Sequence, residues 1–517
     1  MSLSPASLTP TGFTLPAMLR DIASSTPDAP AVTMDGVTLT FAELQDRSAR
    51  TARLLAARGI GRGDRVAILD KNSPAFYDVL FGAAKLGAVL IGLNYRLAAD
   101  ELRAIVADAE PKLCFVSDGL RSLLPATAGV VTLGPEFDAL RQAEDSTDVQ
   151  AGTTPDDIVL QLYSSGTTGR PKGAMLTNAN LSWTVRMGRE HYAMSAASVN
   201  LVPSPLFHIG GVGYGLTTMG QGGHTVLVRD VDPGVMLGLI ARHHVTHSFM
   251  VPSVIQMLIE HPDIARTDLS SLQRVAYGGA SMGQSLLIKA IGTLGCEFMA
   301  VYGMTETAGT VISMGPADHD PGGPRAGLLR SIGQPLPWVE TRIADPQTGA
   351  GTPAGTVGEI WIRSPQNMAG YWGQPELTAA TLVADGWLRT GDAAYEDADG
   401  FVFMHDRIKD MVVTGGENVY PAEVEKVMSG HPAVREVAVI GVPSDRWGET
   451  VKAVVIVRPD AQLDPAELIA WTRDRLAHYK CPTSVDLVTE LPKNATGKLL
   501  KHQLRAPYWQ PLGTGRP

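Results

Sequence analysis

The sequence predicts an α/β protein with a large N-terminal domain, built from parallel-sheet subdomains and a β-rich part, and a small α+β C-terminal domain. Short apolar stretches alternate with helical patterns as far as about residue 330, which is typical of parallel sheets covered by helices on both faces. From Gly333 onward, β-branched stretches lie between Gly, Pro and Asp turns. We place the N-terminal domain at residues 1–406, with its β-rich part at about 330–405, and the C-terminal domain at 407–517.

The first elements of the chain carry clear local signals. Asp35 and Gly36 predict the turn of a hairpin over residues 31–40. Thr40 and Glu43 have the spacing of a capping box, so a helix should begin there and stop near Gly59. The other elements expected in this part are strands at 65–69, 88–93 and 112–116, and helices at 73–86 and 100–107.

The later elements follow the same reasoning. Pro252 predicts the start of a helix over residues 252–260, and the residues from Ala506 onward are expected to be loosely held. We expect strands at 158–162, 199–203, 225–228, 247–251, 274–277, 297–301, 339–343, 358–363 and 401–404, and, in the C-terminal domain, helices at 421–428 and 465–478 with strands at 434–442 and 451–457.

Composition excludes several classes of protein. A hydrophobic fraction of 44% and a charged fraction of 19% are atypical of disordered chains, and a net charge of −10 argues against a nucleic-acid partner. Three cysteines far apart predict neither a disulfide framework nor a zinc cluster. Residues 1–13 lack the regions of a signal peptide, and the apolar stretch 79–93 is too short for a membrane span. We therefore expect a cytoplasmic protein without stable membrane insertion.

One stretch, residues 163–173, combines glycines, hydroxyl side chains and two cations directly after the apolar strand pattern at 158–162. Glycines let backbone N–H groups turn toward a ligand, and Arg170 and Lys172 add positive charge, so the stretch suits a polyphosphate. It is not a Walker A loop, because Lys172 is followed by Gly173 and not by Ser or Thr.

Five motifs now occur in one order along the chain. They are the loop at 164–172, YGMTET at 302–307, RTGD at 389–392, DRIKD at 406–410 with GGENVYP at 415–421, and PKNATGK at 492–498. Together they resemble the motifs of the adenylate-forming superfamily, which contains acyl-CoA synthetases, the adenylation domains of peptide synthetases, and luciferases. The resemblance extends from Thr40 to Lys498 and is strongest to the acyl-CoA synthetase (fatty-acid-CoA ligase-like) branch.

The resemblance implies a reaction in two halves. A carboxylate attacks the α-phosphate of ATP and expels pyrophosphate, and a thiol, most simply that of coenzyme A, then takes the acyl group and releases AMP. Negative charge gathers on phosphoryl oxygens, so such catalysis consists mostly of positioning and cationic stabilisation, with Mg²⁺ as a partner of the phosphates.

The resemblance also implies roles for individual residues. Glu306 binds Mg²⁺, Thr305 lies near the α-phosphate, and Lys498 reaches the reacting carboxylate. Tyr302, with Gly303 and Met304 after it, stacks on adenine opposite Gly278, Gly279 and Ala280, while Asp392 and Arg407 hold the ribose. The catalytic set is Lys498, Glu306, Thr305 and Thr168, and the phosphates are held by Ser164, Ser165, Gly166, Thr167, Thr168, Gly169 and Lys172. Ala300 departs from the polar residue that many relatives carry two places before the motif tyrosine.

The thioester half and the acyl pocket are implied by the same resemblance. The C-terminal domain swings about the hinge Lys409, which brings Gly415 and Gly416 to the pantetheine channel. His208 gates the acyl or pantetheine entrance, although a loop histidine capping a strand remains an equal alternative. Small or apolar residues expected to line the acyl pocket are Gly211, Val212, Tyr277, Gly278, Gly303, Met304 and Ala308, which favours a hydrophobic acid.

We therefore expect an ATP-dependent acyl-CoA synthetase for a fatty, aryl or polycyclic acid. The main alternative is a ligase that loads the phosphopantetheine of a carrier protein acting in trans. A nucleotide-binding protein without ligase activity and an oxygen-dependent, luciferase-like activity rank below these two. The sequence leaves open the acid, the pathway and the oligomeric state.

Overall fold

The structure is a computed structural model and describes residues 12–125, 129–164, 171–280, 282–346, 348–407, 410–414, 417–444, 447–493 and 499–509. The chain divides into two compact units, the first of residues 1–340 and 363–388 and the second of residues 341–362 and 389–517. The second unit therefore groups much of the β-rich part with the C-terminal residues. The expected functional boundary between residues 406 and 407 stays a prediction.

The first unit contains a nine-stranded sheet whose strands from β13 to β1 are all parallel. Antiparallel strands close both edges, and the hairpin turn at Asp35 and Gly36 forms as expected, with φ of 50° and 79°. In spatial order the strands are β15 (Gln334–Pro335), β14 (Gly309–Met314), β13 (Glu297–Met304), β12 (Arg274–Gly278), β11 (His247–Met250), β9 (Val199–Val202), β10 (His224–Leu227), β1 (Pro30–Met34) and β2 (Val37–Thr40).

A seven-stranded sheet forms the other half of the first unit, and only β8 and β18 run antiparallel to their neighbours. Neither β8 nor β18 was expected from the sequence. Each is defined by its pairing with another strand, β8 with β7 and β18 with β8. In spatial order the strands are β18 (Gly370–Tyr371), β8 (Lys172–Thr177), β7 (Ile158–Ser164), β4 (Val89–Gly92), β3 (Arg65–Leu69), β5 (Leu113–Val116) and β6 (Val130–Thr132).

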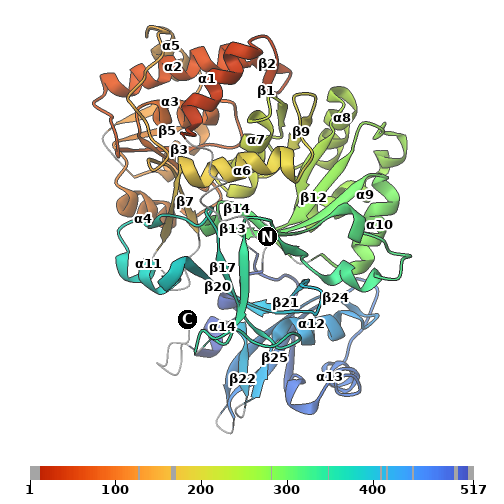
Figure 1. Cartoon of the computed structure of the whole chain (residues 1–517). Coiled ribbons are helices and arrows are strands. Elements are labelled where there is room, and N and C mark those ends of the chain that lie inside the picture. The colour runs from red at the N-terminus through yellow and green to blue at the C-terminus, as the bar shows by residue number, and fades with distance from the viewer. Residues whose placement is uncertain are drawn as a thin grey trace. The chain divides into compact units, whose positions relative to one another are not determined.

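Helices cover these two sheets, and in Figure 1 α8, α9 and α10 lie beside β12. The capping box that opens α2 is present, because Glu43 N donates to Thr40 Oγ1 and Thr40 N donates to Glu43 Oε2. The helices are α1 (Leu15–Ser25), α2 (Phe41–Ala57), α3 (Ala75–Lys85), α4 (Ala99–Ala109), α5 (Pro135–Gln142), α6 (Asn178–Glu190), α7 (Ile209–Met219), α8 (Pro233–His243), α9 (Pro252–Ile259), α10 (Gln284–Leu294) and α11 (Pro375–Thr381).

One hydrophobic core joins the two sheets. It contains buried side chains of α3 and β7 from the seven-stranded side and of α7 and β10 from the nine-stranded side. Helices α3 and α7 approach so closely that a Cβ on Gly215 would lie 2.0 Å from the hydroxyl of Tyr77. The relative position of the two sheets is therefore set by close packing of buried helices.

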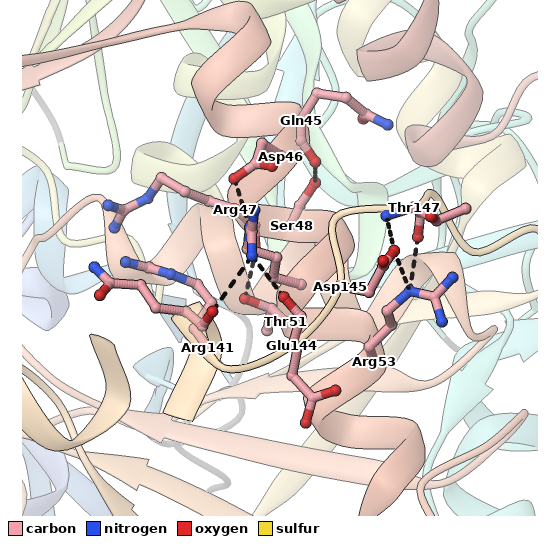
Figure 2. A network of polar contacts seen from close by, with 12 residues as sticks. Gln45, Asp46, Arg47, Ser48, Thr51, Arg53, Arg141, Glu144, Asp145 and Thr147 are labelled. Carbon is pink, nitrogen blue, oxygen red and sulfur yellow. Dashed lines mark hydrogen bonds and ion pairs between the residues drawn. The ribbon is translucent and has the colours of Figure 1, made fainter. Parts of the chain in front are cut away.

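Polar contacts fasten α2 to the segment that follows α5 (Figure 2). Arg53 Nε donates to the carbonyl of Thr147 at 2.9 Å, and Thr147 N donates to Asp145 Oδ1 at 2.6 Å. Below this surface layer, Arg47 and Arg141 both pair with the fully buried carboxylate of Asp78, at 2.6 and 2.7 Å. A buried charge needs such partners, because removal from water is costly for an unpaired ion.

In its described residues, the second unit contains strands of two further sheets and three α-helices. One sheet has the order β16 (Glu340–Ala344), β17 (Gly358–Arg363), β20 (Trp387–Glu396) and β19 (Leu382–Val383), with β21 (Val402–Arg407) on β20. Most of its residues belong to the second unit, whereas β19 falls within residues 363–388, which are counted with the first unit. The other has the order β23 (Glu417–Val419), β22 (Val412–Thr414), β25 (Gly448–Val457) and β24 (Val434–Ser444), with β26 (Ser484–Leu487) on β25. The helices are α12 (Pro421–Ser429), α13 (Pro465–Arg473) and α14 (Lys501–Trp509).

Two expectations about the C-terminal part need correction. Helix α13 ends at Arg473 and not at residue 478, and Ala477 has extended dihedral angles. Residues from Ala506 to Trp509 belong to α14, and Trp509 Nε1 donates to the carbonyl of Gly441 at 3.1 Å, so this part of the end is held in place. Residues 510–517, to which the same expectation applied, lie outside the described residues. Among the residues described, the helices are all too short or too polar to span a bilayer.

Candidate active site

Two predicted nucleotide-binding segments lie side by side at the carboxyl ends of neighbouring parallel strands. Gly278 ends β12 and pairs with Val301 of β13, which places residues 278–280 beside residues 302–304. A Cβ on Gly278 would lie 2.2 Å from the carbonyl oxygen of Val301, and Gly279 has φ of +75°. Both positions therefore require glycine. Ligands of open α/β sheets bind beyond such strand ends.

A sharp turn after β13 directs Glu306 inward. Residues 305–307 form one 3₁₀ turn, in which Met304 N donates to Thr307 Oγ1 at 3.0 Å. Ala308 then adopts a left-handed φ of +49°, and Thr184 Oγ1 donates to its carbonyl at 2.7 Å. A Cβ on Gly303 would lie 1.9 Å from the carbonyl oxygen of Gly309, so the turn can close only over a glycine.

Glu306 is only 5% exposed and has a set of partners that the sequence did not reveal. Tyr371 donates its hydroxyl to Glu306 Oε1 at 2.8 Å, and Met368 N donates to the Glu306 carbonyl at 2.8 Å. Burial, and then the Glu306 charge, raise the pKa of Tyr371 far above its usual value. The phenol therefore stays protonated and remains a donor at neutral pH.

A second buried residue, Gln366, supports the same turn. Its Nε2 lies 3.3 Å from the carbonyl of Thr307 and 3.2 Å from that of Thr310, and its Oε1 accepts from Trp338 Nε1 at 2.8 Å. Gln366 is fully buried. No local motif marks Gln366 or Tyr371, because each acts on a residue about sixty positions earlier in the chain.

The predicted phosphate loop joins β7 to β8. Ser164 and Lys172 are register partners in this antiparallel pair, so the loop begins and ends at the same point of the sheet. The ammonium of Lys172 lies 5.8 Å from the ring centroid of Tyr371. The side chain of Ser164 and the predicted residues Ser165, Gly166, Thr167, Thr168 and Gly169 lie outside the described part of the chain.

In the second unit, Glu359 organises the turn that carries Asp392. Glu359 Oε1 accepts from Gly391 N at 2.9 Å, and Glu359 Oε2 lies 3.0 Å from the guanidinium of Arg389. Gly391 has φ of +71°, and Asp392, which is 4% exposed, is the register partner of Arg407. The structure therefore brings the two predicted ribose residues together. The Arg407 side chain and Lys409, Gly415, Gly416 and Lys498 lie outside the described residues.

The loop before α7 carries His208 and is held by Asn72. Asn72 Nδ2 donates to the carbonyls of Ser204 and Val228 at 3.0 and 2.9 Å, and Asn72 Oδ1 accepts from Leu206 N at 2.9 Å. Burial, and then the charge of Arg96, lower the pKa of His208 to about 4, so its imidazole is neutral. His208 is the N-cap residue of α7 but forms no side-chain capping bond.

The residues expected to line the acyl pocket do not all share one face. Gly211 packs so tightly that a Cβ would lie 2.1 Å from the Pro205 carbonyl oxygen, and Val212 is fully buried in the core. Tyr277 and Gly278 are successive strand residues and point to opposite faces of the sheet. The hydroxyl of Tyr277 lies 3.1 Å from His319 Nε2. The acyl-binding role of Tyr277 stays a prediction.

A cavity of about 740 Å³ lies at the amino ends of β11, β12 and β13, opposite the glycine-rich ends described above. It is lined by Ala193, His247, Leu272, Gln273, Arg274, Ile291, Gly295, Cys296, Glu297, Phe298, Pro316, Ala317 and His319. Arg274 and Glu297 pair with each other there. Within the described parts of the chain, this lining includes none of the predicted site residues.

Comparison with known proteins gives consistent matches over nearly the whole chain. The profile of the family described as AMP-binding enzyme matches residues 19–372, and that of the AMP-binding enzyme C-terminal domain matches residues 423–498. The chain is 39% identical over 498 residues to the fatty acid–[acyl-carrier-protein] ligase ScoC of Streptomyces coeruleorubidus, covering 94% of this chain and 95% of that protein. It is 40% identical over 485 residues to a feruloyl-CoA synthase of an Amycolatopsis species, covering 93% and 96%. The crystal structure of ATP-bound MatB from Rhodopseudomonas palustris superimposes with a TM-score of 0.87 at 31% identity, covering 95% and 99%.

Proposed function

Because this chain belongs to the AMP-binding enzyme family, we propose that it is an ATP-dependent acyl-CoA synthetase acting on a hydrophobic carboxylic acid. The relatives named above are acid–thiol ligases, namely a feruloyl-CoA synthase and a fatty acid ligase. The acid of this enzyme is therefore an aryl-substituted or fatty acid, with a polycyclic acid as a further option. ATP and coenzyme A are both available in the cytoplasm, where we place the reaction.

In the first half-reaction, a carboxylate oxygen of the acid bonds to the α-phosphorus of ATP while the bond to pyrophosphate breaks. Tyr302 stacks on adenine opposite residues 278–280, and Asp392 accepts hydrogen bonds from the ribose. Thr305 lies by the α-phosphate, and the loop with Lys172 holds the outer phosphates. Lys498 neutralises the reacting oxygens. No side-chain nucleophile is needed, since catalysis here is positioning and charge stabilisation.

Glu306 would hold the magnesium ion that accompanies ATP. In the described residues no group of three or more His, Cys, Asp or Glu side chains could bind a metal by itself. A single buried carboxylate fits Mg²⁺, because this ion usually keeps several waters and is shared with substrate phosphates. When bound, the ion neutralises phosphate charge. Glu306, fixed by Tyr371 and the 3₁₀ turn, supplies the protein's share of its ligands.

In the second half-reaction, the thiol sulfur of coenzyme A bonds to the acyl carbon, and AMP leaves. In this proposal Lys498 acts on the reacting carboxylate in the first half-reaction, and it withdraws before the thiol attacks. We propose that the C-terminal domain, residues 407–517, turns about Lys409 and brings Gly415 and Gly416 beside the pantetheine arm. Glycine suits a backbone that passes close to a ligand.

The observation that carries this proposal is the buried Glu306 in the turn after β13, the strand that pairs with the glycine-rich end of β12. Lys172 lies nearby, over the ring of Tyr371. The test is a screen for acid-dependent pyrophosphate release with fatty, hydroxycinnamic and polycyclic acids, followed by detection of the CoA thioester. If none of these acids caused pyrophosphate release, the proposal would be contradicted.

The role of Lys498 has its own test. Lys498→Ala should abolish most acyl-adenylate formation but keep most thioester formation from supplied acyl-adenylate. Equal losses in both halves would show that the assigned role is wrong.

A carrier protein is the second candidate acceptor, and one observation favours it. The relative that is 39% identical is named as an acyl-carrier-protein ligase. If the enzyme releases pyrophosphate with an acid but forms no thioester with free coenzyme A, a phosphopantetheinylated carrier protein should accept the acyl group instead.

A further inference from the structure

Tyr371 lies between Glu306 and Lys172, two residues to which the proposed function gives separate tasks. We propose that Tyr371 is a positioning residue that orients the Glu306 carboxylate toward metal-bound nucleotide and keeps this carboxylate at a fixed position relative to Lys172. This inference rests on the proposed function, since it concerns the same site. It assigns a role to a residue outside the motifs that reveal the family.

The contact with Glu306 is direct and shielded from water. The Tyr371 hydroxyl donates to Oε1 at 2.8 Å, and the two residues are 6% and 5% exposed. A hydrogen bond to an ionised group is about twice as strong as one between neutral groups. A carboxylate offers about four acceptor positions, so one bond at Oε1 fixes its orientation and leaves capacity for a cation.

The contact with Lys172 uses the ring of the same side chain. The ammonium nitrogen lies 5.8 Å from the ring centroid, within the range of an attractive cation–π contact. One aromatic side chain therefore donates a hydrogen bond to the anionic residue through its hydroxyl and lies within cation–π range of the cationic residue through its face. Removing the hydroxyl alone should disturb Glu306 and spare Lys172.

The backbone holds Tyr371 in this place. Strand β18 pairs with β8, which sets Tyr371 opposite Ala174, and Trp372 N donates to the carbonyl of Gly173 at 2.8 Å. Tyr371 N donates to Thr378 Oγ1 at 2.9 Å. Tyr371 is thus attached to β8, the strand that begins at Lys172.

The experiment measures ATP binding by calorimetry, once with excess Mg²⁺ and once with EDTA. Tyr371→Phe keeps the ring and loses the hydroxyl, so Mg-ATP affinity should fall about tenfold while metal-free ATP affinity stays unchanged. Tyr371→Leu also loses the ring, so metal-free ATP should bind more weakly as well. Tyr508→Phe removes a comparable tyrosine–carboxylate bond, to Asp486 in the second unit, and should not change the response to Mg²⁺.

A double-mutant cycle tests whether Tyr371 acts on Mg-ATP binding through the Glu306 carboxylate. In a Glu306→Gln background, Tyr371→Phe should cause little further loss of Mg-ATP affinity, because the carboxylate it orients is gone. Equal weakening of ATP with and without Mg²⁺, or no weakening at all, would overturn the inference. If no acid supports pyrophosphate release by the unaltered enzyme while Tyr371→Phe still weakens Mg-ATP selectively, the proposed function fails and the positioning role stands.

Discussion

Asn72 offers the most direct test of how the loop that carries His208, the predicted acyl entrance, is held in place. It follows β3 of the seven-stranded sheet, and its amide bonds to Ser204, Leu206 and Val228, which lie beyond the ends of β9 and β10 of the nine-stranded sheet. One buried side chain thus ties the two sheets together immediately before Phe207 and His208. Asn72→Ala removes this tie without adding volume.

The expected loss of unfolding free energy follows from the three hydrogen bonds of the Asn72 side chain. The substitution deprives two carbonyls and one N–H of these partners at a site where Asn72 is 4% exposed. Each buried polar group left unpaired costs about 1–3 kcal/mol. Since water can enter the vacated space and satisfy part of the demand, we expect the lower end for each group, about 3 kcal/mol in total.

Urea unfolding of the first unit measures the loss of unfolding free energy. The rate of pyrophosphate release at increasing concentrations of the carboxylic acid substrate measures the effect on the loop that carries His208. We expect KM for the acid to rise while KM for ATP stays close to its original value. Asn94→Ala is the matched control, because Asn94 makes one exposed bond, to Arg96 N at 3.0 Å, and should cost less than about 1 kcal/mol. A loss below 1 kcal/mol for Asn72→Ala, or equal changes in both KM values, would refute the reasoning.

Three further predictions concern other parts of the site. Gly303→Ala should lower the rate of acyl-adenylate formation at least a hundredfold, or about 2.7 kcal/mol, since its Cβ would lie 1.9 Å from the Gly309 carbonyl oxygen; near-normal rates would contradict this. Glu359→Gln should weaken ATP binding about tenfold through the turn with Gly391, and unchanged affinity in a binding titration would show that this turn does not need the charge. The free energy of unfolding should fall by up to about 1.4 kcal/mol per pH unit for each histidine with a lowered pKa as the pH drops from about 6.5 to 4. The reason is that the unfolded chain binds more protons than the folded chain in this pH range. Burial lowers the pKa to about 4 for His191, His208, His224 and His247, so a His224→Gln variant should show a shallower loss in acid-dependent unfolding, and an equal slope would count against it.

Much of the fold could be predicted from local patterns. The hairpin turn at Asp35 and Gly36, the capping box at Thr40 and strands such as β3 and β12 agree with the sequence, because each is decided by neighbours within a few residues. Helix α14 was missed, since its stability comes from contacts such as that of Trp509 with the distant Gly441. Short strands such as β18 were missed for the same reason.

Some residues of the candidate site could likewise be recognised from the sequence, whereas others could not. Motif glycines could be recognised in the sequence, and the structure gives a physical reason for Gly278, Gly303 and Gly391, where a Cβ would collide or φ is positive. The residues that support the site carried no signal of their own. They act on partners far along the chain, as Tyr371 does on Glu306.

The sequence by itself determined the class of fold, the family and the chemistry, because glycines, hydroxyls and charges at set spacings are enough to identify a nucleotide-dependent ligase. Only the tertiary structure decided which side chains orient those groups. Asn72, Glu359, Gln366 and Tyr371 reach their partners through strand pairing and the packing of whole sheets. Such contacts join segments that lie far apart in the chain, so they form only once the strands have paired and the sheets have packed.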